Sequence, residues 1–248
     1  MRPLIRWTVG NIKSRLGWEV FSESVRLIPK VYPEFDFVIC HNNLSVEEEE
    51  RLKCYGVSLY RQNRSEIGFP VCWEEGRSVL GKSDVFVWKL VPPRLRPQSH
   101  ELWVDNDIII RDRIPEIDEW LTSDTGLISL GFYPNYGIFE DRIPPDFKSC
   151  AGLFGLPPNF DFADKILEYC GDQVLQGYDE QGLVTLIVSE MDGFVGVSID
   201  HMRSLAPERT LWDYPLGMRD WPIGMHFHHT NHASRHNPWS IYKLLTLP

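Results

Sequence analysis

Apolar and polar positions along the chain form blocks that predict strands separated by helices. Short apolar runs are typical of strands buried on both faces, whereas an apolar residue at every third or fourth position indicates a helix. The predicted strands cover residues 4–9, 35–40, 57–60, 102–107, 126–131 and 194–199. The strand 102–107 is expected to continue in an extended conformation over 108–110. The predicted helices cover residues 19–28, 45–55, 83–91, 160–170 and 181–191.

This alternation predicts the fold class. Strands separated by helical segments pair in parallel through crossovers, so we expect an α/β fold with a mainly parallel twisted sheet flanked by helices. Residues 132–150 and the tail after residue 200 are rich in Pro, aromatic residues and His, and we expect them to shape a site at the carboxyl ends of the strands. No linker or repeat marks a boundary, so we expect a single domain over residues 1–248, with residues 200–248 closing the site.

Composition and charge exclude several classes of protein. The 248 residues are 43% hydrophobic and 24% charged, which is an ordinary globular composition. The formal net charge of −10 argues against a nucleic-acid partner, because nucleic-acid binders usually carry a basic face. Five cysteines without a CxxC pair predict neither a disulfide framework nor a zinc knuckle. No stretch approaches 18 apolar residues, so we expect a cytoplasmic protein without a transmembrane segment.

The clearest chemical signal is the pair Asp105 and Asp107, at the end of the predicted strand 102–107. Two carboxylates two residues apart in an extended segment project to the same side. An unpaired charge beside apolar residues is costly, so the pair predicts a divalent cation with open positions for substrate phosphates. A solvated turn is the alternative, since this pattern also occurs by chance.

Histidines gather near the C-terminus, and we expect one of them to be a metal ligand. An imidazole beside carboxylates favours manganese over magnesium. His226 is preferred because it follows the apolar residues 223–225, and His228 is its competitor because it lies one strand period further on. For any single histidine, a polar loop is the alternative. The histidines of this tract are His226, His228, His229, His232 and His236.

Two weaker signals accompany these. Small residues around Gly152 allow a backbone to approach a ligand closely, although a tight strand entry has the same composition. Asp179, Glu180 and Gln181 stand at the start of a predicted helix, where Asp179 can serve simply as a helix cap. No P-loop, Ser/His/Asp order or GxGxxG is present, so nucleotide handling by those routes is excluded.

In their order along the chain, these segments resemble the GT-A glycosyltransferases, in particular the family 8-like type of glycogenin and the lipopolysaccharide galactosyltransferases. In that family a strand ends in D-x-D and is followed by N-S-G-hydrophobic, D-Q-x-x-L and H-F-x-G-x-x-K-P-W. The corresponding segments here are Asp105-Asn106-Asp107, Cys150-Ala151-Gly152-Leu153, Glu180-Gln181-Gly182-Leu183, and His226-Phe227 through Pro238-Trp239.

The resemblance implies a metal-dependent transfer of a sugar from a nucleotide diphosphate donor to a saccharide or other acceptor, with retention and with Mn²⁺ or Mg²⁺ as cofactor. The implied metal ligands are Asp105, Asp107 and His226. The implied catalytic residues are Asp179 and Glu180, which would orient the sugar, and Gln181, near its anomeric carbon. The implied donor-binding residues are Thr8, Gly10, Asp84, Lys89, Asp105, Asn106 and Gly152.

The chain departs from the family pattern at several positions. Cys150 and Ala151 replace an asparagine and a serine, and Asn237 replaces a lysine expected at the diphosphate. The family's D-Q pair aligns with residues 180–181 or, after a shift of one residue, with 179–180. Arg235, His236 or Lys243 could supply the missing positive charge, and Trp212, Tyr214, Trp221, Phe227 and Trp239 could close over the site.

Two other functions suit the same residues. A metal-dependent phosphohydrolase or nucleotidyltransferase also uses carboxylates and histidines around a cation. A non-catalytic nucleotide-sugar binding protein would explain the altered motif residues.

Overall fold

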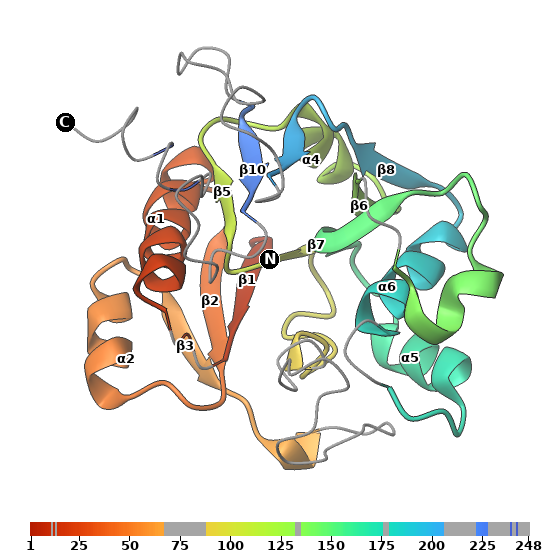
Figure 1. Cartoon of the computed structure of the whole chain (residues 1–248), viewed down its shortest axis with the longest axis horizontal. Coiled ribbons are helices and arrows are strands. Elements are labelled where there is room, and N and C mark those ends of the chain that lie inside the picture. The colour runs from red at the N-terminus through yellow and green to blue at the C-terminus, as the bar shows by residue number, and fades with distance from the viewer. Residues whose placement is uncertain are drawn as a thin grey trace.

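The larger of two sheets lies at the centre of the molecule (Figure 1). The computed structural model describes residues 1–10, 12, 14–66, 88–131, 135–175, 179–205, 222–227, 239 and 242. Within them, a seven-stranded sheet and a three-stranded sheet are formed. The larger sheet contains, in spatial order, β3 (Ser58–Arg61), β2 (Asp36–His41), β1 (Leu4–Val9), β4 (Glu101–Val104), β7 (Ser149–Leu156), β6 (Gly126–Leu130) and β8 (Phe194–Val197). The smaller contains β5 (Ile108–Ile110), β10 (Gly224–His226) and β9 (Met202–Ser204).

The larger sheet is mainly parallel, as the sequence predicts. β1 pairs in parallel with β2 and β4, β2 with β3, and β6 with β8. β7 runs antiparallel to both of its neighbours, β4 and β6. The start of β7 therefore lies at the same edge as the carboxyl end of β4.

Helices cover both faces of this sheet. The helices of the described residues are α1 (Arg15–Val31), α2 (Val46–Lys53), α4 (Pro115–Trp120), α5 (Phe162–Cys170) and α6 (Asp179–Ser189), with 3-10 turns η1 (Arg64–Glu66) and η2 (Gly137–Arg142). Apolar residues of α1, including Phe21 and Val25, share one buried cluster with Trp7 of β1. Those of α5 and α6 share a second cluster with Trp103 and Phe154. Figure 1 shows α1 and α2 beside β1–β3, and α5 and α6 on the other side of the molecule.

Local signals explain several helix boundaries. Ser45 and Glu48 form a capping box at the start of α2, each accepting a hydrogen bond from the other's backbone N–H. The Ser14 side chain accepts from the Gly17 backbone at the start of α1. The expected range of that helix, 19–28, is too short at both ends.

Other predictions also need correction. The strand 102–107 ends at Val104, because the chain turns at Asp105–Asp107 and the Ile108 N–H donates back to the Asp105 carbonyl at 3.1 Å. Residues 108–110 then join the second sheet instead of continuing the first. The segment 132–150, for which no helix or strand was predicted, contains η2 and the start of β7. Helix α6 starts at Asp179, two residues before the expected range, and α4 was not predicted.

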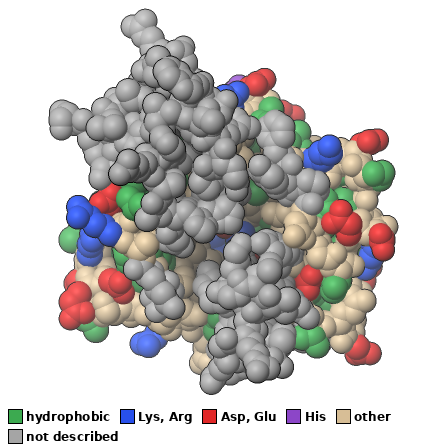
Figure 2. Space-filling model, in the orientation of Figure 1, with side chains coloured by type: hydrophobic (Ala, Val, Ile, Leu, Met, Phe, Trp, Pro, Cys, Tyr) green, Lys and Arg blue, Asp and Glu red, His purple; other side chains and the backbone are tan. Residues whose placement is uncertain are grey.

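The surface reflects the acidic composition. Exposed acidic residues of η2 and α5 are Glu140, Asp141, Asp164 and Glu168. Figure 2 shows acidic side chains on the flank where these two elements lie. Among the helices that the structure describes, none is long and apolar enough to cross a bilayer. The predicted helix 83–91 lies outside the described residues except for its last four positions.

Candidate active site

The turn after β4 brings two carboxylates to the carboxyl edge of the larger sheet. Asp105 follows Val104 directly, and its N–H donates to the Gly152 carbonyl of β7 at 2.8 Å. The side chains of Asp105 and Asp107 remain 26% and 23% exposed. The predicted convergence of the two side chains is thus achieved by a turn and not, as expected, by the alternation of an extended strand. Asn106 lies between them in the turn and is partly buried.

Strand β10 adds His226 to these carboxylates, although it lies more than a hundred residues further along the chain. His226 pairs antiparallel with Ile108, and the next N–H, of Phe227, donates to the Asp107 carbonyl at 2.9 Å. His226 Nε2 lies 3.0 Å from Asp107 Oδ1 and 3.8 Å from Asp105 Oδ2. Ligand atoms of these three residues all lie within 4.8 Å of one another. The spacing suits a single metal ion.

Gly152 leaves the space that His226 occupies. A Cβ at this position would lie 2.5 Å from His226 Cε1 and 3.2 Å from Asp105 Oδ2. Contacts of the first length do not occur between real atoms, so a side chain here would displace the imidazole. The requirement for a small residue in β7 therefore comes from the histidine.

A buried lysine connects this group to helix α6. Lys89 Nζ lies 2.7 Å from Asp105 Oδ1 and 2.9 Å from Glu180 Oε1, and it donates to the Ala151 carbonyl at 3.1 Å. The side chains of Lys89 and Glu180 are only 10% and 3% exposed. A cation between two carboxylates at this depth makes the cluster a charge-assisted network.

The pKa values show how strongly these charges depend on one another. Burial opposes the charged form of Lys89, yet Asp105 and Glu180 raise its pKa above the usual range. Burial raises the pKa of Glu180 to about 7 despite the opposing effect of Lys89. Burial also raises the pKa of Asp105, whereas Lys89 and His226 oppose that increase. Burial lowers the pKa of His226, but Asp107 and Cys150 together outweigh this effect and raise the pKa well above its ordinary value.

The backbone on either side of Lys89 is anchored by buried side chains. Gln62 donates to the Trp88 carbonyl at 2.8 Å and also to the Val91 carbonyl. Arg6 donates to the Val91 carbonyl at 2.9 Å, and the indole of Trp103 donates to the Lys89 carbonyl at 3.2 Å. The lysine is therefore positioned by the sheet beneath it.

The three predicted catalytic residues occupy different environments at the start of α6. Asp179 is buried, and its Oδ1 accepts from the Ile138 N–H at 3.0 Å. Glu180 belongs to the lysine cluster. Gln181 is partly exposed, and its Nε2 donates to the Asn135 carbonyl at 3.1 Å.

Close backbone contacts hold this helix end in place. Gly137 has φ +55°, and a side chain on it would collide with Asp179. A side chain on Gly182 would collide with the Tyr136 carbonyl. The N-terminus of α6 therefore lies directly against the start of η2 and the residue before it.

Thr8 and Gly10 lie at the carboxyl end of β1, next to β4 in the sheet. Thr8 Oγ1 is buried and has no hydrogen-bond partner within the described part of the chain. Several predicted residues lie outside the described residues: Asp84, Trp212, Tyr214, Trp221, His228, His229, His232, Arg235, His236, Asn237, Pro238 and Lys243. Phe227 is fully buried with Trp239 and Tyr242 in a third apolar cluster, so it is a core residue and does not close over the site.

Sequence reasoning missed two contributions from β7. The Ala151 carbonyl accepts from Lys89, and Cys150 Sγ lies 3.7 Å from His226 Nδ1. Backbone acceptors have no sequence signal. Cys150 had a sequence signal, since it stands where the resemblance implies an asparagine. Its contact with His226 could not be derived from the sequence.

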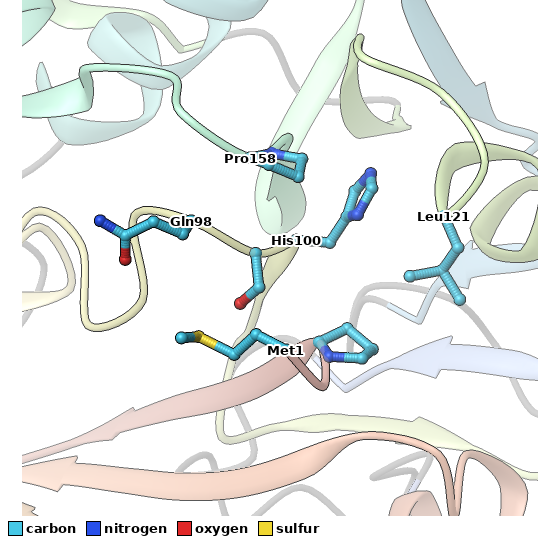
Figure 3. Close-up of a pocket in the computed structure, with 7 residues that line it drawn as sticks. Met1, Gln98, His100, Leu121 and Pro158 are labelled. Carbon is cyan, nitrogen blue, oxygen red and sulfur yellow. The ribbon is translucent and has the colours of Figure 1, made fainter.

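A separate cavity of about 330 Å³ lies at the opposite edge of the sheet (Figure 3). His100 immediately precedes β4, so this cavity opens at the amino ends of the strands. It contains no carboxylate among its lining residues, which include Met1, Gln98, His100, Leu121 and Pro158. The Asp105, Asp107 and His226 group and the lysine cluster beside it lie at the other edge, and we place the candidate active site there.

Comparison with known proteins identifies the fold. No protein-family model matches the chain, and no curated protein matches it by sequence. The galactosyltransferase LgtC, solved with donor and acceptor sugar analogues, superposes with a TM-score of 0.59 at 14% identity, covering 99% of this chain and 97% of LgtC. Mouse xyloside xylosyltransferase 1 gives 0.56 at 12% identity, covering 93% and 98%. The glycosyltransferase GlyE of Streptococcus pneumoniae TIGR4 gives 0.56 at 12% identity, covering 96% and 56%. The chain has the GT-A glycosyltransferase fold, and the fold expectation is confirmed.

Proposed function

We propose that this chain is a glycosyltransferase that transfers a sugar from a nucleotide diphosphate donor to a saccharide or other acceptor. The observation that carries the proposal is the convergence of Asp105, Asp107 and His226 from two separate segments at the carboxyl edge of a GT-A sheet. Ligands of α/β sheets bind at this edge. LgtC, which shares the fold, was solved with donor and acceptor sugar analogues.

The residues present suit a divalent cation. Two carboxylates and an imidazole form a mixed oxygen and nitrogen donor set that fits Mn²⁺, or Mg²⁺, and leaves positions open for phosphate oxygens. Gly152 leaves the room that His226 needs beside Asp105. When bound, the cation would act as a Lewis acid that neutralises charge on the diphosphate leaving group.

The other residues of the cluster bind and orient the donor. Lys89 holds Asp105 in place through its ion pair and keeps a positive charge at the edge where the diphosphate would lie. Thr8 and Gly10 would contact the nucleoside, because they end the strand beside β4. Asn106 and Gly152 complete the donor surface. The closing of the site by residues 200–248 of a single catalytic domain remains part of this proposal.

We expect retention of configuration. Gln181 is an amide and cannot act as a general base, whereas an inverting transfer needs a base on the acceptor hydroxyl. Glu180 is paired with Lys89, and Asp179 accepts a backbone hydrogen bond, so both would act mainly by positioning. In LgtC, which shares the fold, the replacement of a glutamine by glutamate is described as an active-site mutation.

A screen of nucleotide sugars by thermal shift, with and without Mn²⁺, tests the proposed donor class. A true donor stabilises the folded state by mass action, by about 2.7 kcal/mol at a hundredfold excess over its Kd. We expect one nucleotide sugar to raise Tm only when Mn²⁺ is present. Acceptor-independent release of phosphate products would contradict the proposal, as would donor binding without transfer to any acceptor in a saccharide panel.

Two further measurements test the stereochemistry and Gln181. Proton NMR of the product should show an α-linkage from an α-linked donor, and a β-linked product would disprove retention. Gln181→Ala should lower turnover with little change in donor affinity. Unchanged turnover would remove Gln181 from the site.

A further inference from the structure

Cys150 lies directly behind the candidate metal-binding histidine. Its Sγ lies 3.7 Å from His226 Nδ1, while His226 Nε2, on the other side of the ring, faces Asp107 at 3.0 Å. We propose that Cys150 is a positioning residue that holds His226 with Nε2 directed at the cation. This inference rests on the metal site of the proposed function.

The geometry distinguishes this role from direct ligation. Asp105, Asp107 and His226 can all place one ligand atom within 4.8 Å of the others, and Cys150 is not part of that group. An imidazole that directs Nε2 toward the two carboxylates directs Nδ1 away from them. Cys150 therefore contacts the Nδ1 side of the ring, opposite the Nε2 side where the cation would bind.

The chemistry of metal-bound histidine explains why such a partner matters. A histidine that binds through Nε2 carries its proton on Nδ1, and a hydrogen-bond acceptor there fixes both tautomer and ring orientation. Carboxylates and carbonyls usually do this, and loss of such a partner typically costs 10- to 100-fold in metal affinity. A sulfur atom is a weaker acceptor, so the lower part of that range applies to Cys150.

Cys150 is itself held in place. It pairs with Ser129 across β6 and β7, and the Ser129 hydroxyl donates to the Cys150 carbonyl at 2.7 Å. Gly131 passes close to it, since a Cβ there would lie 3.1 Å from Cys150 Cβ. Two neighbours in one strand thus act on the same imidazole: Gly152 leaves room for the ring, and Cys150 contacts its Nδ1.

Mn²⁺ affinity, measured by titration calorimetry on the full chain, tests the role. We expect Cys150→Ala to bind Mn²⁺ roughly tenfold more weakly, and Cys150→Ser to stay within about threefold of wild type because a hydroxyl also accepts. The matched control is Cys54→Ala, since Cys54 is an exposed free cysteine at the end of α2. If Cys150→Ala and the control both bind Mn²⁺ with wild-type affinity, the positioning role of Cys150 is overturned, and the proposed metal site is not affected. Failure of the wild-type chain to bind Mn²⁺ would overturn both the inference and the proposed metal site.

Two further measurements start from the wild-type thiol, and the second of them needs no variant. With Co²⁺ as probe, we expect no thiolate-to-metal charge-transfer absorption, and such a band lost in Cys150→Ser would show direct ligation and overturn the positioning role. Mn²⁺ should slow alkylation of Cys150 without affecting Cys54, because binding fixes the imidazole against the sulfur. Equal alkylation rates of Cys150 with and without Mn²⁺ would contradict the inference.

Discussion

The two ends of strand β4 each carry a cluster of buried charges, and the clusters differ in how completely their charges are satisfied. At the amino end, Glu101 pairs with Arg6 and Arg94. At the carboxyl end, Asp105 pairs with Lys89 and faces His226. One short strand therefore connects two buried charge clusters, one at each of its ends.

The Glu101 carboxylate of the amino-end cluster is closed to solvent, and its oxygens are saturated with hydrogen bonds. The side chains of Glu101 and Arg6 are 0% exposed. The Glu101 carboxylate accepts from both guanidinium groups and from the N–H groups of Leu95 and Arg96 at 3.0 Å. No oxygen of this carboxylate is left to bind a ligand.

The carboxyl-end cluster remains partly open. Asp105 and Asp107 keep about a quarter of their side chains exposed, and burial shifts the pKa values of Glu180 and Asp105 upward. Perturbed titration in a partly exposed cluster is typical of functional sites, whereas complete pairing is typical of scaffold. Four predictions test this difference.

Removal of the charge at the amino end should affect the fold most. Glu101→Gln leaves Arg6 and Arg94 buried without a counter-charge, and breaking such a cluster costs about 3–5 kcal/mol. Urea denaturation measures this loss of unfolding free energy. Glu50→Gln is the control, because Glu50 pairs with Lys53 on the surface and its loss should not be measurable. A change in Glu101→Gln as small as in the control would mean that the two ends of β4 do not differ.

Glu180→Gln, in contrast to Glu101→Gln, should raise the free energy of unfolding at neutral pH. Its folded pKa of about 7 lies above the ordinary 4.5, so the fold favours the protonated acid and the wild type loses stability as pH rises through this interval. The variant avoids that loss, so its advantage over wild type should grow by about 3 kcal/mol between pH 4.5 and about pH 8. Denaturation in cation-free buffer across this range measures the difference. A pH-independent difference would contradict the raised pKa.

Asp107→Asn should separate binding from folding. Loss of one ligand charge should weaken Mn²⁺-dependent donor binding roughly 100-fold, or about 2.7 kcal/mol, while the chain still folds, because the Asp107 side chain is partly exposed. Asp105→Asn should weaken it less, since Lys89 shares that carboxylate. The exposed Asp112→Asn is the control for both variants. Wild-type donor affinity in Asp107→Asn would disprove the metal assignment.

Gly152→Ala should have the smallest effect of the four. The new methyl group must displace His226, and we expect a roughly tenfold loss of Mn²⁺ affinity, about 1.4 kcal/mol. Gly196→Ala in β8 is the control, because a Cβ there meets only the flexible end of Leu130. Equal Mn²⁺ affinity in the two variants would show that the ring is not confined by Gly152.

The periodicity of the sequence was sufficient for the strands and helices whose signals are local. Strand β1 has the predicted ends, and the helix predicted over 45–55 is formed as α2. Asp105 and Asp107 stood out because charge follows an apolar strand, and His226 because it follows an apolar run. The order of these motifs led to the GT-A fold through family resemblance. Their distances from one another could not be derived from that order.

The partners across space were decided only by the tertiary structure. The antiparallel direction of β7, the separate sheet of Ile108–Ile110 and the contact of Cys150 with His226 depend on pairing between segments far apart in the chain. Likewise, the sequence indicated that Lys89 carries charge, but only the fold shows that it lies between Asp105 and Glu180. Hydrophobic periodicity and helix capping depend on residues close together in the chain, so they can be recognised in short stretches of the sequence. Strand direction, buried ion pairs and pKa values depend on which groups meet when the sheets assemble, and that is determined by the packing of the whole chain.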